Sequence, residues 1–377
     1  MEKKKILIIS GTIFPSMFPR SYRSTELAKE LARQGHEVIL YAVLGSFDYS
    51  QFEKEHSLKV RNIGKLLFAT LSSDGIGRNN FFDKVLRKLF YRLFEFPDIE
   101  LMFKIPGIIR REKDIDLLIS VAMPFPIHWG CALAKTISPI NFPKVWAADC
   151  GDPYMGDKLL GFKRLFYFSF IEKWFCGKTD YIIVPIQGAI KGYYSDFHNK
   201  IEVIPQGFPF DDLKSIEVQT PNPVPTFAYS GIFYKDFRNP TLFLEYLTTV
   251  KIDFRFILYT PNVELIKPYM IKLGRKIEVR DYVPRDQLLN ALRQMDFLVN
   301  FDNGTSVHSP SKLIDYAILK KPILTISPKS LPIIHIEEFL KGDYSHQFII
   351  MDVEQYNIVN IAKKFLQLST RYKNEII

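Results

Sequence analysis

The segment SPSKLIDYAILKKPILTIS (residues 309–327) decides the fold, because it joins a capped helix to a buried strand. Ser309 and Ser311 are residues that cap helices, and Pro322 ends the helix and admits the β-branched run ILTIS. The apolar residues of the helix share one face, at Ile314, Ala317 and Ile318. A helix that leads directly into a buried strand is typical of a parallel α/β sheet.

The same alternation extends outward from this segment to most of the chain. In the second half, strands are expected at residues 226–231, 254–260, 276–283, 296–301 and 322–327, with helices from Pro240, Val263, Arg285 and Ser311. In the first half, strands are expected at residues 4–10, 38–42, 116–122, 145–148 and 180–185, with helices from Arg23, after Pro126 and through residues 160–176. This order predicts two Rossmann-like α/β domains with parallel sheets and right-handed crossovers.

The segment VQTPNPVP (residues 218–225) interrupts this pattern with three prolines, and we interpret it as the interdomain linker. The expected domains are therefore residues 1–217 and 226–352. Residues 353–377 contain an amphipathic helix that we expect to pack back on the first domain. Open parallel sheets bind ligands at the carboxyl ends of their strands, so we expect both sheets to face a central cleft.

Composition excludes several classes of protein. With 377 residues, 47% of them apolar, the chain is long enough for two folded domains and is neither disordered nor fibrous. The 3 cysteines (Cys131, Cys150 and Cys176) form no CxxC pair, so we interpret them as small buried apolar residues. The net charge of +9 permits an acidic partner, but no RNP motif or zinc module indicates nucleic acid.

The apolar run at Ile6–Ile9 is shorter than the roughly 7 to 15 residues of a secretory signal. No window reaches the roughly 18 apolar residues of a membrane-spanning helix. We therefore expect a cytoplasmic protein, with peripheral contact at the inner face of the membrane as an open alternative.

The start of the helix in residues 309–327 is suited to an anion. Ser309, Ser311 and Lys312 stand at the positive end of the helix dipole, which favours a diphosphate. One turn later, the Asp315 carboxylate can accept hydrogen bonds from a ribose diol. The alternative is that Ser309 only caps the helix and Asp315 is a solvated surface residue.

This segment and two others resemble glycosyltransferase family 4, the retaining transferases of the GT-B fold. The other two are FAYSGIFYKDFR (227–238) and EVIPQGFPFDDL (202–213). The resemblance extends over the first domain, at FPRSYRSTELAKELARQGHEVILYA (18–42), DLLISVAMPFPIHWGCALAK (116–135) and VWAADCGDPY (145–154). Each match is loose alone, and their order and spacing make them specific.

The resemblance implies donor-binding residues in the second domain. Gly231 lies in the turn where a glycine lets the backbone approach phosphate. Lys235 and Arg238 match the basic residues that contact the diphosphate and would stabilise charge on the leaving group. Tyr282 would border the nucleotide base.

The resemblance also exposes one departure from the family. Asp315 matches the second acid of the family's paired glutamates, but Val307 stands where the first acid is expected. Asn303, Ser306 or His308 could take over the missing contact to the sugar.

In the first domain, the loop from Gly11 to Arg23 resembles the family's loop that faces sugar and acceptor. Arg20 and Arg23 are candidate contacts for an anion, and plain surface arginines at the start of a helix are the alternative.

Three further residues of the first domain follow strand ends. His128 matches the family's histidine near the sugar, although a lone buried histidine is more often structural. Asp149 and Asp152 could position the acceptor hydroxyl or serve as its base. Asp152 followed by Pro153 could equally form only a turn.

The function that these matches imply is transfer of a sugar from a nucleoside-diphosphate sugar to a sugar hydroxyl, with retention of configuration. No cofactor or metal is expected, because the helix dipole and basic side chains do the work of magnesium. The expected setting is bacterial surface polysaccharide synthesis (capsule, O-antigen or exopolysaccharide). The alternatives are a nucleotide-sugar epimerase of the same fold and an inactive transferase-like scaffold.

The segment NNFFDKVLRKLFYRLFEF (79–96) combines an apolar and a basic helix face. Such a helix suits the interface of an anionic membrane, where a lipid-linked glycan acceptor would be found. An ordinary helix packed on its own sheet is an equally good interpretation.

Overall fold

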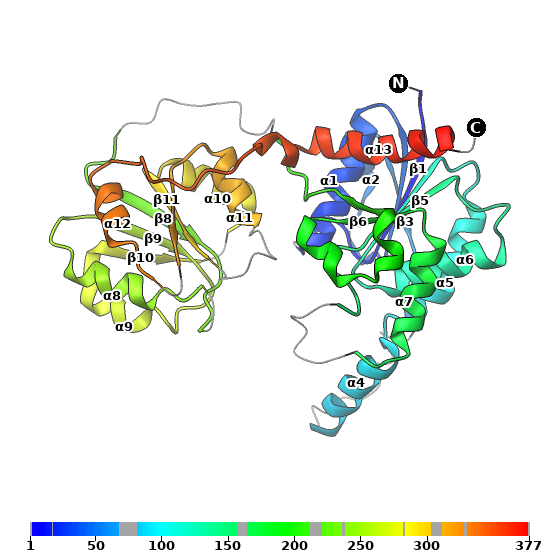
Figure 1. The fold of residues 1–377 in the computed structure, drawn as a ribbon, viewed down its shortest axis with the longest axis horizontal. Coiled ribbons are helices and arrows are strands. Elements are labelled where there is room, and N and C mark those ends of the chain that lie inside the picture. The colour runs from blue at the N-terminus through cyan, green and yellow to red at the C-terminus, as the bar shows by residue number, and fades with distance from the viewer. Residues whose placement is uncertain are drawn as a thin grey trace. The chain divides into compact units, whose positions relative to one another are not determined.

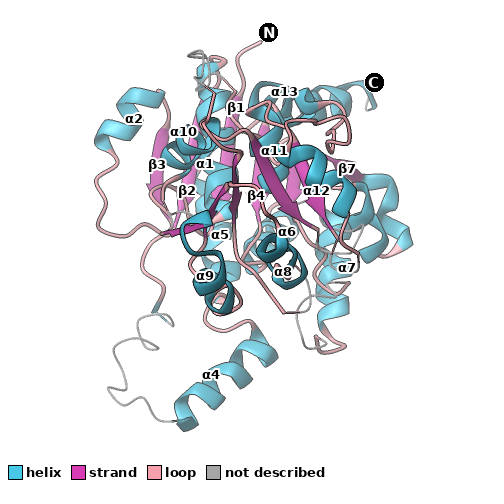
Figure 2. Cartoon of the chain, turned by 90° about the vertical axis from the view of Figure 1, so that its left-hand side faces the viewer, coloured by secondary structure: helices cyan, strands magenta, loops and turns pink. Residues whose placement is uncertain are grey.

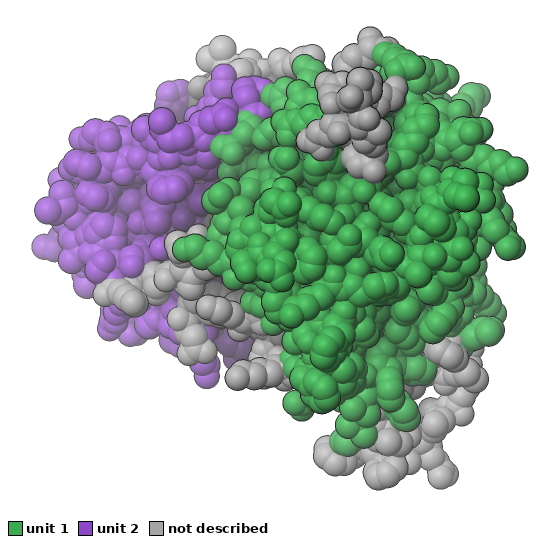
Figure 3. Space-filling view, turned by 45° about the vertical axis from the view of Figure 1, so that its right-hand side comes forward, with its two compact units in different colours: residues 1–209, 355–377 green, residues 210–354 purple. Residues whose placement is uncertain are grey.

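The computed structural model describes residues 2–16, 18–67, 81–156, 164–210, 221–235, 238–281, 283–302, 311–327 and 330–375. The chain forms two compact units (Figure 3). Unit 1 comprises residues 1–209 and 355–377, and unit 2 comprises residues 210–354.

Unit 1 contains a seven-stranded parallel sheet in the order β3-β2-β1-β4-β5-β6-β7. Its strands are β1 (Lys5–Ser10), β2 (Glu37–Ala42), β3 (Lys59–Asn62), β4 (Leu117–Val121), β5 (Val145–Asp149), β6 (Tyr181–Val184) and β7 (Ile201–Val203). Strand β4 pairs in parallel with both β1 and β5, so the carboxyl ends of β1, β4 and β5 are neighbours at one edge of the sheet.

Helices cover both faces of this sheet (Figures 1 and 2). The helices of this unit are α1 (Pro19–Arg33), α2 (Ser50–His56), α4 (Phe81–Phe94), α5 (Glu100–Arg111), α6 (Pro126–Ile137), α7 (Phe168–Lys178) and α13 (Ile358–Glu375), and of these α4 extends away from the sheet. The 3₁₀ turns are η1 (Gln187–Gly192) and η2 (Ser195–Lys200), with η5 (Val353–Tyr356) at the boundary with unit 2. Ile6 and Ile8 pack toward α1 and α13, whereas Leu7 and Ile9 pack toward α5 and α6. This burial on both faces explains the continuously apolar strand.

Two helix boundaries differ from the sequence expectation. Helix α1 begins at Pro19 rather than Arg23, because proline has the φ angle of a first helical residue. Arg20 therefore lies in the first turn and Arg23 lies within the helix. The helix expected at residues 160–176 is observed as α7, Phe168–Lys178.

Unit 2 contains a five-stranded parallel sheet in the order β10-β9-β8-β11-β12. Its elements are β8 (Thr226–Ser230), α8 (Thr241–Thr249), β9 (Arg255–Tyr259), α9 (Lys267–Leu273), η4 (Gly274–Lys276), β10 (Ile277–Arg280), α10 (Arg285–Arg293), β11 (Phe297–Phe301), α11 (Ser311–Ile318), β12 (Ile323–Ile326) and α12 (Ile333–Leu340). Stacked aromatic rings fill one face of the sheet, with Phe227 4.5 Å from Phe297 and 4.8 Å from Phe256 between centroids. The expected α/β class with two parallel sheets is confirmed.

Two composition-based expectations can be compared directly with the structure. Cys131, Cys150 and Cys176 are all buried and unpaired to one another, which confirms their interpretation as apolar residues. Among the helices in the described part of the chain, none is both long and apolar enough to cross a membrane.

Candidate active site

The β1–α1 loop of unit 1 is shaped by close packing and by hydroxyl groups. A Cβ at Gly11 would lie 2.7 Å from Cδ of Pro124, so a glycine lets this loop pack against the loop after β4. The Thr12 and Ser21 hydroxyls are 2.5 Å apart, and Ser21 Oγ donates to Ser16 Oγ at 3.0 Å. These bonds fix the loop against the first turns of α1.

Arg23 lies in the protein interior and bonds only to groups of unit 1 in the contacts that the structure describes. Its Nε donates to Asp149 Oδ2, while Nη1 and Nη2 donate to the carbonyl oxygens of Pro205 (2.7 Å) and Ile204 (3.0 Å). Both Arg23 and Asp149 are buried. The expectation that Arg23 offers its charge to a bound anion therefore does not match its placement, because the guanidinium faces inward from the middle of α1.

Both Arg20 and Arg23 were expected to contact an anion, and of the two only Arg20 is partly exposed. Its Nη1 lies 3.6 Å from Asp149 Oδ1, its Nη2 donates to the Cys150 carbonyl at 3.4 Å, and its side chain is 24% exposed. The guanidinium rests on Gly151, where a Cβ would lie only 1.0 Å from Nη2. Gly151 also has a left-handed φ of +73°. Gly151 was not among the site residues predicted from the sequence.

His128 is fully buried in the first turn of α6, and its ring centroid lies 5.5 Å from the ring of Phe125 and 5.5 Å from that of Phe175. Its Nδ1 lies 2.8 Å from Ser120 Oγ, which also accepts a hydrogen bond from Trp146 Nε1 at 2.8 Å. Burial, and secondarily the nearby Arg20 charge, lower the pKa of His128 to about 3. The imidazole is therefore neutral at physiological pH.

Two buried polar atoms at adjacent strand ends have no hydrogen-bond partner within the described residues. They are Nε2 of His128 and Oδ1 of Asp149, and the Arg20 guanidinium lies 3.6 Å from this Asp149 oxygen. Buried polar atoms are almost always hydrogen-bonded in native proteins. Trp129 Nε1 and Glu172 Oε2 of the same unit are likewise buried without a partner, so what distinguishes His128 Nε2 and Asp149 Oδ1 is their place beside Arg20.

Asp152 is exposed in the loop after β5. Glu172 of α7 supports the following residues by accepting hydrogen bonds from the backbone N–H groups of Tyr154 (3.1 Å) and Met155 (3.3 Å). Burial raises the pKa of Glu172 to about 7. The loop thus combines an ordered backbone with one carboxylate that faces solvent.

In unit 2, Asp315 of α11 pairs with Arg285, the first residue of α10. Asp315 Oδ1 accepts from Arg285 Nη2 at 2.6 Å and from Nε at 3.1 Å. Burial raises the pKa of Asp315, and the Arg285 charge opposes this shift. Asp315 is therefore not the freely solvated surface residue of the alternative interpretation. Sequence reasoning missed Arg285, because only the fold brings α10 to α11.

The end of β8 carries the expected glycine turn. Gly231 has a φ of +148° and donates its N–H to the Tyr259 carbonyl at 2.8 Å. The backbone N–H of Ser230 donates to Tyr316 Oη at 3.1 Å, which ties β8 to α11. Beyond this turn, Lys235 is exposed and Arg238 is half-buried.

Comparison with protein families identifies the chain. The sequence model of Glycosyltransferase Family 4 matches residues 23–212, about half of the 377-residue chain. The chain belongs to glycosyltransferase family 4. A search of curated proteins gives no match for this family 4 chain.

Solved structures with the same fold span the whole family 4 chain. The lipopolysaccharide outer core galactosyltransferase WaaB (TM-score 0.62, 12% identity) covers 97% of this chain and 99% of its own. HepE of Anabaena in complex with UDP (TM-score 0.57, 11% identity) covers 99% of both chains. UDP-GlcNAc 2-epimerase of Neisseria meningitidis bound to UDP-GlcNAc (TM-score 0.56, 11% identity) covers 97% of this chain and 100% of its own. These similarities show the GT-B glycosyltransferase fold.

Several predicted donor residues of this family 4 chain fall outside the described part of the structure. They are Tyr282, Asn303, Ser306, His308 and Ser309, and Val307, where the family's first acid is missing, falls outside it as well. Ser311 and Lys312 form the first helical residues of α11, and their side chains are likewise outside the described part. Their roles remain predictions.

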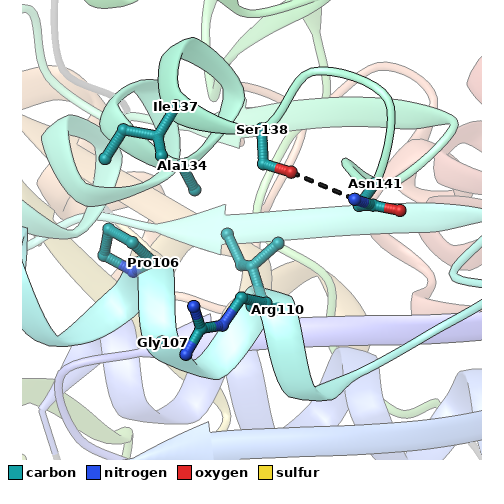
Figure 4. Close-up of a pocket in the computed structure, with 8 residues that line it drawn as sticks. Pro106, Gly107, Arg110, Ala134, Ile137, Ser138 and Asn141 are labelled. Atoms are coloured by element: carbon teal, nitrogen blue, oxygen red, sulfur yellow. Dashed lines mark hydrogen bonds between the residues drawn. The ribbon is translucent and has the colours of Figure 1, made fainter.

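Two surface grooves of unit 1 lie away from these residues. One, of about 250 Å³, separates α5 from the end of α6 beside Arg110, Ile137 and Asn141 (Figure 4). The other, of about 450 Å³, lies beside residues 112–115 and 140–144. Both adjoin the segments that enter β4 and β5, whereas the candidate active-site residues follow the strand ends.

Proposed function

We propose that this chain transfers a sugar from a nucleoside-diphosphate sugar to a sugar hydroxyl with retention of configuration. The observation that carries the proposal is the cluster of Arg20, His128 and Asp149 at the adjoining ends of β1, β4 and β5. Its two unpartnered buried atoms, His128 Nε2 and Asp149 Oδ1, suit hydroxyl groups of a sugar. Membership of family 4 supports sugar transfer as the reaction class.

His128 acts in this proposal as a neutral hydrogen-bond donor. Because Trp146 Nε1 donates to Ser120 Oγ, the Ser120 hydroxyl hydrogen can be donated to His128 Nδ1. We assign the ring proton to Nε2 on this basis. Nε2–H then holds a sugar hydroxyl, and the low pKa of the ring keeps that donor uncharged.

Asp149 and Asp152 have different tasks in the proposal. Asp149 is buried against Arg23, and it positions Arg20 at the edge of the site. Asp152 is exposed, so it can contact the incoming acceptor hydroxyl. Arg20 offers a partly exposed cation to the acceptor or to a phosphate.

Unit 2 binds the donor nucleotide in this proposal. Gly231, Lys235, Arg238, Ser309, Ser311 and Lys312 surround the diphosphate. Asp315, oriented by Arg285, accepts hydrogen bonds from the ribose diol, and Tyr282 borders the base. One of Asn303, Ser306 and His308 supplies the sugar contact that Val307 lacks.

We propose attack on the same face from which the nucleotide leaves. The acceptor oxygen bonds to the anomeric carbon as the bond from that carbon to the diphosphate oxygen breaks. The acceptor proton passes to the departing phosphate, whose developing charge the basic side chains and the α11 dipole stabilise. The sequence expectation that no metal takes part in this step belongs to the same proposal.

The experiment that tests this function follows the anomeric configuration of the released sugar. Purified protein is incubated with UDP-glucose, UDP-galactose and UDP-N-acetylglucosamine, with water or simple pyranosides as acceptors, and products are followed by proton NMR. A transferase that retains configuration releases α-configured product first. Initial release of β-configured sugar would overturn the mechanism, and no release from any donor by wild-type protein would favour the inactive scaffold.

Epimerisation is the second candidate function, because a UDP-GlcNAc 2-epimerase shares the fold over nearly the whole chain. An epimerase interconverts the nucleotide sugar without an acceptor. The same NMR experiment separates the two functions: conversion of UDP-N-acetylglucosamine to its 2-epimer in the absence of acceptor would replace the transferase proposal.

We further propose a lipid-linked glycan of the bacterial surface as acceptor, reached through helix α4. Among the side chains described on α4, Val85, Leu89, Phe90 and Phe94 are 45–52% exposed. Lys88 and Arg92 are exposed beside them, and the helix extends away from the sheet (Figure 1). These apolar side chains are more exposed than packing on a sheet would leave them. The fold similarity to a lipopolysaccharide galactosyltransferase supports the same acceptor class.

Sedimentation with vesicles tests the membrane contact. Wild-type protein should sediment with phosphatidylglycerol vesicles and much less with phosphatidylcholine vesicles. The L89S/F90S variant should lose this binding. The control is Ile271→Ser on α9, which removes an apolar side chain that is even more exposed, at 88%. Equal sedimentation of all three proteins would contradict the assignment to α4.

A further inference from the structure

A second group of residues with clear chemistry lies on α12 of unit 2 and on the segment that follows it. His335 and Glu338 are three residues apart on α12, so their side chains share one face of the helix. His346 comes from residues 341–350 and lies over the same face, since its ring stacks on His335. None of these residues belongs to the donor or acceptor sites described above.

The three side chains converge closely. His346 Nδ1 lies 2.7 Å from Glu338 Oε2, and the two imidazole rings are 4.4 Å apart with an angle of 9° between their planes. One ligand atom from each of the three residues can be chosen so that all lie within 4.8 Å of one another. Side-chain rotations that break the present stacking of the two rings would bring all three atoms onto one ion.

The backbone beyond α12 is shaped to present His346. Asp343 accepts hydrogen bonds from the Ser345 backbone N–H (3.0 Å) and from the Ser345 hydroxyl (2.7 Å), which forms a tight turn just before His346. Tyr344 packs on Phe339 with 5.2 Å between ring centroids. His346 is thus held against α12 by contacts that do not depend on its own side chain.

We propose that His335, Glu338 and His346 bind a divalent transition-metal ion, with Zn²⁺ as the best match. Two imidazoles and one carboxylate are typical zinc ligands, and water completes a tetrahedral set. His346 is 53% exposed, so both water and the ion have access from solvent. Magnesium and calcium prefer sites made entirely of oxygen ligands and fit this set poorly.

The position of the site indicates a structural task rather than a part in sugar transfer. Residues 341–350 run back to the first residue of β12, where the Phe348 N–H donates to the Ile323 carbonyl at 2.8 Å. The donor residues, in contrast, follow the carboxyl ends of the strands. A bound ion would cross-link α12 to this returning segment and so stabilise the sheet edge formed by β12.

Metal titration of tag-free, chelator-treated protein tests the proposal. Isothermal titration calorimetry should show one Zn²⁺ per chain, and ZnCl₂ should raise the thermal midpoint where MgCl₂ and CaCl₂ do not. Co²⁺ should give the visible absorption bands of a four-coordinate site. The H346A and H335A variants should each bind Zn²⁺ about tenfold or more weakly.

The control is His56→Ala, which removes a histidine of unit 1 outside the cluster. Because His346 is largely exposed, H346A should keep the metal-free thermal midpoint of the wild-type protein; E338Q provides a second variant that alters a ligand without changing its volume. Absence of Zn²⁺ binding in the wild-type protein, or unchanged affinity in H346A, H335A and E338Q, would overturn the proposal. Neither result bears on sugar transfer.

Discussion

At the scale of single residues, Gly151 and Arg20 form one unit, because the guanidinium lies where any other side chain at position 151 would begin. We predict that Gly151→Ala displaces Arg20 and lowers the transfer rate as much as Arg20→Ala does. The left-handed φ of Gly151 should add a destabilisation of about 1 kcal/mol. Steady-state kinetics of both variants and of the double variant provide the test.

The double variant should be no slower than either single variant, because both changes remove the same contact. A Gly151→Ala enzyme with wild-type kinetics would show that the placement of Arg20 does not matter for transfer.

His128 makes stability depend on pH, because its pKa is about 3 in the folded chain and about 6.5 in an unfolded one. As the pH falls below 6.5, His128 becomes protonated in the unfolded state but stays neutral in the folded state, so acid favours unfolding. Between pH 6 and 4, the free energy of unfolding of the wild-type protein should therefore fall with decreasing pH more steeply than that of His128→Asn. The difference between the two slopes should be about 1.4 kcal/mol per pH unit. Urea denaturation of both proteins over this range provides the measurement, and parallel pH profiles would contradict the buried, neutral imidazole.

Some of the residue-level site could be predicted from sequence and some could not. His128 was predicted from its match to the family's histidine, and Asp149 was predicted from its place at the end of an apolar strand. The burial of Arg23 was missed, since it depends on a helix start at Pro19. The pairing of Asp315 with Arg285 was missed, because these two residues are 30 positions apart in the sequence and meet only in the folded unit.

At the scale of elements, the Arg23 guanidinium joins α1 to β5 and to residues 204–205 beyond β7. We predict that Arg23→Ala lowers the free energy of unfolding by about 3–5 kcal/mol, because Asp149 would remain buried without its main counterion. The control is Arg371→Ala on α13. Arg371 is 57% exposed and pairs with Glu202, which is 37% exposed, so its loss should cost about 1 kcal/mol or less.

Urea denaturation followed by circular dichroism measures both variants. Equal destabilisation by the two substitutions would show that the buried pair contributes no more than a surface pair.

The elements that the sequence predicted are those with long apolar patterns. The strands at the centre of each sheet are buried on both faces and were located within one or two residues of their bounds. Strand β3 was missed, because it lies at the sheet edge and only Val60 of its four residues is buried. Helix α2 was missed for a similar reason, since Phe52 is its only buried residue.

At the scale of the whole molecule, the order of strands and helices carried the family resemblance better than any single motif. The family match covers residues 23–212, and the fold matches extend over the second unit as well. The residue that contacts the donor sugar in place of the acid missing at Val307 could not be identified from the sequence, because this contact depends on the geometry of a loop. The choice of sugar depends on the same loops.

The measurement that tests the central claim most directly is thermal unfolding in the presence of UDP, GDP, TDP, CDP and ADP. We predict that one nucleoside diphosphate, with UDP the first to examine, raises the midpoint. A concentration of 100 Kd corresponds to about 2.7 kcal/mol of stabilisation. Asp315→Asn and Lys312→Ala should lose most of this shift, while His128→Asn should keep it, because His128 belongs to unit 1.

A shift that vanishes in the unit 2 variants alone is the result that the account predicts. A midpoint unchanged by every nucleoside diphosphate, or a shift that survives both Asp315→Asn and Lys312→Ala, would contradict donor binding by unit 2.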